Sequence, residues 1–186
     1  MIVRRFLLDV NEANAFLVVC EETKEAMLVD AGAFAPAIAE YIAAYNLKLS
    51  QVFVTHDHYD HTDGLASIVA RYGAKVFAGK HSVGGCDAIR VSHGGTVRVG
   101  RIEGTVRETP GHTPEGISLV IPGHVFTGDA LFAGSVGGTS SPENAKRQID
   151  AIRKHIFALP PDTQIHTGHG PSSTVAIESG FNPFFV

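Results

Sequence analysis

Thr55–His61 holds four potential metal ligands within six positions: His56, His58, Asp60 and His61 form the pattern His-x-His-x-Asp-His. The apolar, β-branched run Ser50–Thr55 before them predicts a buried strand, and Thr62–Tyr72 after them predicts a helix. The ligands are therefore expected on a strand-to-helix turn, where such crowded imidazoles and carboxylates need a cation. The alternative is a polar turn that is rich in His and Asp by chance. It is disfavoured, because metal-site signatures of this length are specific in this context.

Three further places end an expected strand with a residue of metal-ligand type. His112 follows Ile102–Thr109, Asp129 follows His124–Thr127, and His169 follows Gln164–Thr167, each next to glycine. A single Gly-His turn is weak evidence, but loops at strand ends can converge on one site. Five histidines and two aspartates make seven candidate ligands. Seven are too many for one tetrahedral zinc and suit two metals that share a bridging carboxylate.

Composition limits the class of protein. At 186 residues with 44% hydrophobic residues, the chain can bury one core, so residues 1–186 are expected to form a single domain. The net charge of -4 and the lack of a basic run argue against nucleic acid or a membrane as partner. No run is long enough to span a bilayer, and no signal-peptide pattern is present. Cys20 and Cys86 indicate no disulfide framework, so a reducing cytoplasm is the expected location.

The order of expected elements alternates strands and helices in both halves of the chain. This order predicts a layered α/β fold with helices on the outer faces. Ser141-Pro142-Glu143 predicts the start of a helix, with Ser at the cap and Pro at the first helical position. Gly128–Ser141 is expected to be a loop. Gly79–Gly95 shows no clear period and is expected to be irregular, with its role left open.

The ligand pattern resembles the metallo-β-lactamase superfamily, and the resemblance covers nearly the whole chain. It implies a four-layer αββα sandwich of two mixed sheets with outer helices. It implies that Asp129 bridges two metals and that Asp30, at another strand end, orients the site. The other reading of Asp30 is an ordinary turn residue. The remaining ligands are implied to be His56, His58 and His112 on the first metal, and Asp60, His61 and His169 on the second.

Within that superfamily, two segments look like the glyoxalase II group, the hydroxyacylglutathione hydrolases: Phe126–Ser135, and His169–Thr174 with the closing Asn182-Pro183-Phe184. The resemblance implies a thioesterase that uses a metal-bridging hydroxide, with Asp60, Asp129 and Asp30 as its catalytic carboxylates. Two divalent ions are implied, zinc first and iron or manganese next, since all ligands are N or O. The expected partner is a small-molecule thioester such as a glutathione conjugate.

Two departures from the group bear on the substrate. Relatives usually carry Arg after Gly137, and this chain has Gly138. The longer members continue into a helical region that binds much of glutathione, whereas the short bacterial members end about where this sequence ends.

Two other functions stay open. A persulfide dioxygenase of the same fold would hold one iron with His56, His112 and Asp129, a two-His-one-carboxylate face. A metal-binding protein without catalysis is the other, disfavoured because a structural site needs only four ligands. The role of His166 is likewise left open between support of the site and ordinary packing.

Overall fold

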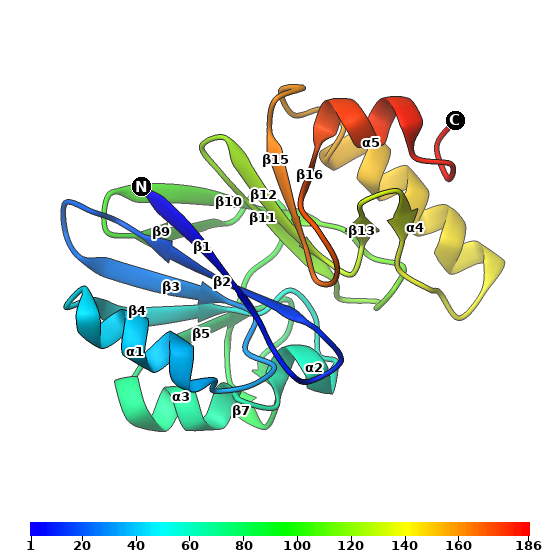
Figure 1. The fold of residues 1–186 in the computed structure, drawn as a ribbon. Helices are drawn as coiled ribbons and strands as arrows, with labels where there is room; N and C mark the ends of the chain where they lie inside the picture. The colour runs from blue at the N-terminus through cyan, green and yellow to red at the C-terminus, as the bar shows by residue number, and fades with distance from the viewer.

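The computed structural model describes residues 1–186 and contains two six-stranded sheets packed face to face (Figure 1). The first sheet has the strand order β1-β2-β3-β4-β5-β8. Its first three strands pair antiparallel, and β3, β4, β5 and β8 pair in parallel. The strands span Ile2–Leu7 (β1), Asn14–Val19 (β2), Glu25–Val29 (β3), Lys48–Phe53 (β4), Lys75–Ala78 (β5) and Ile89–Arg90 (β8).

The second sheet has the strand order β16-β15-β12-β11-β10-β9. All its neighbours pair antiparallel except β12 and β15, which run in parallel. Both sheets are therefore mixed, as expected. The strands span Thr96–Val99 (β9), Ile102–Glu108 (β10), Ile117–Ile121 (β11), His124–Gly128 (β12), Gln164–Thr167 (β15) and Ser173–Thr174 (β16).

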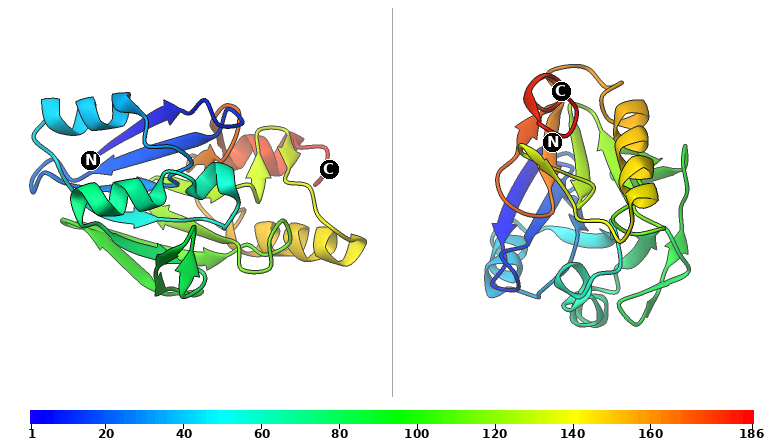
Figure 2. Two further views of the ribbon diagram at one scale, coloured as in Figure 1. Left: turned by 90° about the horizontal axis from the view of Figure 1, so that it is seen from below. Right: turned by 90° about the vertical axis from the view of Figure 1, so that its right-hand side faces the viewer.

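Helices cover both outer faces, which makes the four-layer αββα sandwich that the resemblance implies. Helices α1 (Pro36–Ala44) and α3 (Leu65–Tyr72) lie on the first sheet, and α4 (Pro142–His155) and α5 (Val175–Phe181) lie on the second. The two pairs stay on opposite sides of the sheets in the further views of Figure 2. None of these helices is long and apolar enough to cross a membrane.

Strand alternation explains this layering. In β2 the side chains of Leu17 and Val19 join the cluster under α1 and α3, whereas Phe16 and Val18 point into the space between the sheets. Val125 and Ile165 of the second sheet pack under α4 and α5. The cluster between the sheets draws on both of them: Phe16, Val18, Met27, Val29 and Phe53 meet Val97, Val99, Val106, Ile117, Leu119, Ile121 and Phe126.

Several element boundaries differ from the sequence expectations. The predicted helix Thr62–Tyr72 is two helices, because a short helix α2 (Tyr59–Thr62) begins inside the ligand motif and Gly64 separates it from α3. Gly79–Gly95 contains three short strands, β6 (Ser82–Val83), β7 (Cys86–Asp87) and β8. The expected loop Gly128–Ser141 contains the hairpin of β13 (Leu131–Phe132) and β14 (Ser135–Val136). Two-residue strands leave too few positions for a period to show.

The candidate ligands all follow the carboxyl ends of strands. β3 and β4, which run in parallel, lead to Asp30 and to the His56–His61 turn. In the second sheet, β12 leads to Asp129 and its parallel neighbour β15 leads to His169. β10 leads to His112. The same edge of the sandwich therefore collects side chains from both sheets.

Candidate metal centre

The turn after β4 directs its four candidate ligands toward two different points. His56 lies just past the strand, and His58 has an extended backbone at the cap position of α2. Asp60 and His61 lie within α2, where the amide of His61 donates to the His58 carbonyl at 3.0 Å. The strand end and the helical turn thus aim different ligands at different points.

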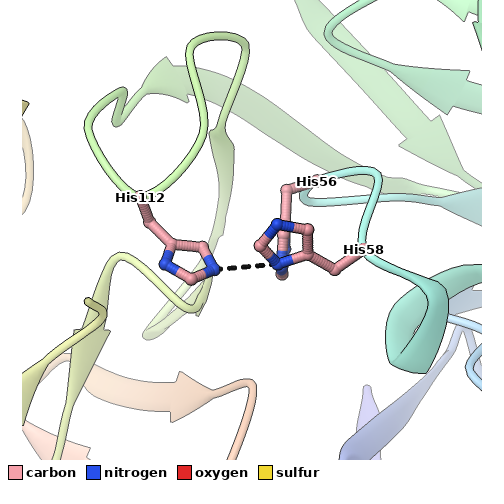
Figure 3. A group of neighbouring side chains, drawn as sticks. All are labelled: His56, His58 and His112. Atoms are coloured by element: carbon pink, nitrogen blue, oxygen red, sulfur yellow. Dashed lines mark hydrogen bonds between the residues drawn. The ribbon is translucent and has the colours of Figure 1, made fainter. Parts of the chain in front are cut away.

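His56, His58 and His112 form a first triad. Nδ1 of His58 lies 3.1 Å from Nε2 of His56 and 3.0 Å from Nε2 of His112. Figure 3 shows the rings of His56 and His58 coming from one segment and that of His112 from another, with the ring nitrogens turned toward one another.

Asp60, His61 and His169 form a second triad. Nε2 of His169 lies 3.4 Å from Nε2 of His61 and 3.4 Å from Oδ2 of Asp60. The donor atoms of each triad lie within 4.8 Å of one another.

Asp129 lies between the two triads. Its Oδ2 is 3.6 Å from Nε2 of His112 and 3.5 Å from Nε2 of His169. Its Oδ1 is 3.3 Å from Nε2 of His61 and yet is buried without a hydrogen bond of acceptable geometry. The structure therefore brings the seven predicted ligands together, with Asp129 between the other six.

The spacing of the donors suits metal ions. Nitrogens bound to one tetrahedral zinc at about 2.0–2.1 Å lie about 3.3 Å apart. The nitrogen–nitrogen distances within the triads are 3.0, 3.1 and 3.4 Å. A buried carboxylate oxygen without a hydrogen bond is costly unless a cation pairs with it. The residues present thus have the donor types and the spacing that suit two divalent cations, together with a buried carboxylate oxygen that has no hydrogen bond.

Asp30 contacts His61 directly and His56 through Thr55. Its Oδ2 accepts from Nδ1 of His61 at 2.9 Å and from the Thr55 hydroxyl at 2.9 Å, and its Oδ1 accepts from the Thr55 amide. Because the Thr55 hydroxyl donates to Asp30, its oxygen is left to accept from Nδ1 of His56, 3.1 Å away. Asp30 has φ of 60°, a costly conformation that these bonds hold in place.

Backbone carbonyls orient two further histidines, His112 and His169, whose Nε2 atoms face the centre. Nδ1 of His112 donates to the carbonyl of Gly138 at 2.7 Å, and Nδ1 of His169 donates to the carbonyl of Asn11 at 3.1 Å. Such outer partners fix which ring nitrogen faces a metal. In four of the five histidines, then, Nδ1 is bound to an oxygen and Nε2 faces the centre.

Sequence reasoning missed the supporting roles of Asn11, Thr55 and Gly138. Carbonyl acceptors carry no side-chain signature, so Gly138 could not be found. Thr55 directly precedes His56, and that position was the one available signal for it.

The electrostatics of the centre reflect a dense group of charges. Burial lowers the pKa of His56 to about 2. Burial also opposes the charged form of His61, but Asp30 and Asp129 outweigh it and raise the pKa of His61 to about 10. Burial opposes ionisation of Asp129 as well, but its contacts with His169 and His61 hold the pKa of Asp129 well below its usual range. The low pKa of Asp129 keeps its carboxylate negative, which suits binding of a cation.

Two glycines allow the close packing. A Cβ on Gly168 would lie 2.0 Å from Oδ1 of Asp129, and one on Gly137 would lie 1.9 Å from the Asp129 carbonyl. His166, by contrast, contacts none of the ligands through hydrogen bonds. It bonds to His124 and Ser172 and stacks on Phe126.

Comparison with known proteins agrees with this geometry. The profile of the Metallo-beta-lactamase superfamily matches residues 8–84. A hydroxyacylglutathione hydrolase of Dechloromonas aromatica is 37% identical over 147 residues, which is 78% of this chain and 54% of the relative. Among solved structures, ETHE1 from Myxococcus xanthus has a TM-score of 0.87 and 31% identity, covering 98% of this chain and 84% of that one. TTHA1623 in a di-iron-bound form has a TM-score of 0.83 and 26% identity, covering 98% and 100%.

This chain belongs to the metallo-beta-lactamase superfamily. Several hydroxyacylglutathione hydrolases are among the curated proteins that it resembles, and the chain spans about half the length of these relatives.

Proposed function

We propose that the protein is a dinuclear metal-dependent hydrolase that cleaves thioesters, of the hydroxyacylglutathione hydrolase type. The observation that carries the proposal is the position of Asp129, within 3.3–3.6 Å of donors from both triads. One carboxylate shared between two complete triads is the arrangement that a two-metal hydrolase needs. The similarity to the Dechloromonas aromatica enzyme supports the substrate class.

In this proposal each triad holds one cation and Asp129 contributes to both. The cations, when bound, would activate a water and polarise the substrate carbonyl. Asp60 and Asp129 offset the positive charge, and Asp30 keeps His61 in its working orientation. A thiolate leaves readily, so no general acid is required of the chain.

We further propose that residues 1–186 act as one domain. The first triad takes His56 and His58 from the first sheet and His112 from the second. The second triad likewise combines residues of both sheets, so neither half of the chain carries a complete site.

A second candidate is the mononuclear iron persulfide dioxygenase, and the similarity to ETHE1 from Myxococcus xanthus favours keeping it. It would use His56, His112 and Asp129. Oδ2 of Asp129 lies 4.0 Å from Nε2 of His56 and 3.6 Å from Nε2 of His112, so these three side chains also lie close together. The two candidates differ in whether the second triad holds a metal.

Metal analysis combined with an activity panel tests the proposal. Protein loaded with zinc, iron or manganese is assayed for hydrolysis of thioesters and lactones, and for oxygen uptake with a persulfide. We expect about two metals per chain and thioester hydrolysis. One tightly held iron, no second ion under metal excess, and oxygen uptake without hydrolysis would replace the proposal with the dioxygenase.

The glutathione part of the substrate is tested separately. Glutathione carries two carboxylates, which call for Arg or Lys contacts. Lys80, near the ligand turn, is already paired with Asp57 and Glu115. A Cβ on Gly138 meets nothing within 4 Å, so an arginine can be added there.

We expect S-lactoylglutathione to be hydrolysed with a high KM and little preference over a lactoyl thioester without the glutathione tail. Gly138→Arg should raise that preference roughly tenfold to a hundredfold, the worth of one charged contact of about 1.5–3 kcal/mol. Gly138→Gln, similar in reach but uncharged, is the matched control. A preference above about a thousandfold in the unaltered protein would reveal a glutathione site already built.

A further inference from the structure

The two triads are supported in different ways. Among the second-triad residues, His61 is fixed from the buried interior by Asp30. Asp60 and His169 are fixed from outside, and both by the same residue, Asn11, on the exposed turn between β1 and β2.

Asn11 uses both its side chain and its backbone. Its Nδ2 donates to Oδ2 of Asp60 at 3.1 Å, the one side-chain hydrogen bond that this carboxylate accepts. Its carbonyl accepts from Nδ1 of His169 at 3.1 Å. Oδ2 of Asp60 is also the oxygen that faces Nε2 of His169, 3.4 Å away. Asn11 therefore sets the direction of two of the three donors in the second triad.

The backbone of the turn is held in the shape that these two contacts need. Asn11 and Glu12 have φ of 49° and 53°, a left-handed region that asparagine tolerates better than most residues. The amide of Asn14, at the end of the turn, donates to the carbonyl of Gly168 at 2.7 Å. The turn is thus attached to the loop of His169 as well as to α2.

None of these contacts reaches the first triad. His56 is oriented by Thr55 and His112 by the carbonyl of Gly138. Asn11 therefore supports residues of the second triad and contacts none of the first.

We propose that Asn11 is a positioning residue that controls the occupancy of the second metal position independently of the first. The inference rests on the proposed dinuclear centre and adds to it a residue that governs binding of the second metal. A neutral amide holds the Asp60 carboxylate in place without competing as a cation would, and the carbonyl keeps Nε2 of His169 turned inward. Loss of the side chain leaves Asp60 free to rotate, so the second ion binds more weakly while the first is unaffected.

The test is a stepwise metal titration of metal-free protein with zinc, for the unaltered chain and for Asn11→Gly. Glycine accepts the left-handed backbone and retains the carbonyl, so it removes only the amide contact to Asp60. Glu12→Gly is the matched control, because its backbone is equally left-handed and its side chain makes no hydrogen bond. Loss of a hydrogen-bond partner of a metal ligand typically weakens metal binding about tenfold to a hundredfold.

We expect Asn11→Gly to weaken the second binding step by about that factor and to leave the first step, and both steps of Glu12→Gly, unchanged. Equal weakening of both steps, or no change in either, overturns the role assigned to Asn11. If the unaltered chain takes up only one zinc, the dinuclear function and this inference both fail. If it binds two without hydrolysing any thioester, the proposed function fails and the titration still decides the role of Asn11.

Discussion

At the scale of single residues, Asp129 links the two halves of the centre. It is buried, its pKa is held low by contacts with His169 and His61, and its Oδ1 has no hydrogen bond. A residue so placed contributes charge rather than hydrogen bonding.

Asp129→Asn keeps the shape of the side chain and removes that charge, so we expect weaker binding at both metal positions rather than at one. Metal content after dialysis should fall from about two per chain to below one. Asp63→Asn, which changes an exposed carboxylate at the end of α2, should retain both ions. Loss of a single ion from Asp129→Asn would assign that carboxylate to one metal only.

His166 makes stability depend on pH. It is 8% exposed, and burial together with neighbouring His124 lowers its pKa from 6.5 to about 4. The unfolded chain therefore binds a proton in a range where the folded chain does not, and stability falls as pH drops from about 6.5 to about 4. The loss should reach about 3 kcal/mol at the lower end.

Denaturant unfolding of metal-free protein across this pH range measures the effect. His166→Gln removes the titrating group, so its stability should decline less steeply on acidification. Equal slopes in the two proteins would show that other groups account for the acid sensitivity.

The candidate ligands could be proposed from the sequence because imidazole and carboxylate side chains are themselves the expected donor groups. The four candidate ligands of the motif lie within six positions, and His112, Asp129 and His169 each follow a strand beside glycine. The residues that hold these side chains in place were harder to predict. Asn11 lies about fifty residues from Asp60, and one of its two contacts is made by a carbonyl that any residue possesses. Contacts of that kind depend on the tertiary fold, which spacing does not reveal.

At the scale of elements, the long periodic segments were predictable and the short ones were not. The cap and proline at Ser141-Pro142 correctly marked the start of α4, where Ser141 accepts from the amide of Asn144. The sequence did not predict the helix at Tyr59–Thr62, because four residues make about one turn and show no helical period. Its helical form places Asp60 and His61 toward the second triad while His58 serves the first.

The loop after β15 offers a comparison between two glycines. A Cβ at Gly168 would lie 2.0 Å from Oδ1 of Asp129, whereas one at Gly170 would meet nothing within 4 Å. Gly168→Ala should therefore displace the Asp129 carboxylate and lower metal content. Gly170 has φ of 72°, so Gly170→Ala should cost about 1 kcal/mol of stability and leave metal content unchanged.

Metal analysis and thermal unfolding of both variants separate the two effects. Retention of two metals by Gly168→Ala would mean that the Asp129 carboxylate can move aside without losing its ligands.

At the scale of the whole molecule, the candidate centre joins the two sheets. His56, His58, Asp60 and His61 follow β4 of the first sheet, while His112, Asp129 and His169 follow strands of the second. The sheets also share the apolar cluster between them, so they do not depend on the centre for contact. At the edge where the ligands gather, however, the buried Oδ1 of Asp129 has no hydrogen bond.

Metal removal should therefore lower thermal stability without unfolding the chain. A cation that binds only the folded state adds about 4 kcal/mol per site when present at a thousand times its dissociation constant. For a chain of this size, each kcal/mol shifts Tm by about 2–4 °C, so chelation should lower Tm by roughly 8–16 °C for each ion removed. Scanning calorimetry with and without a chelator, followed by return of zinc, measures the shift and its reversal. Asp129→Asn should show a smaller shift because it holds metal weakly from the start. A Tm that is equal in the metal-free and metal-loaded forms of the unaltered protein would show that the ions do not couple to folding, and that the apolar cluster alone holds the sheets in register.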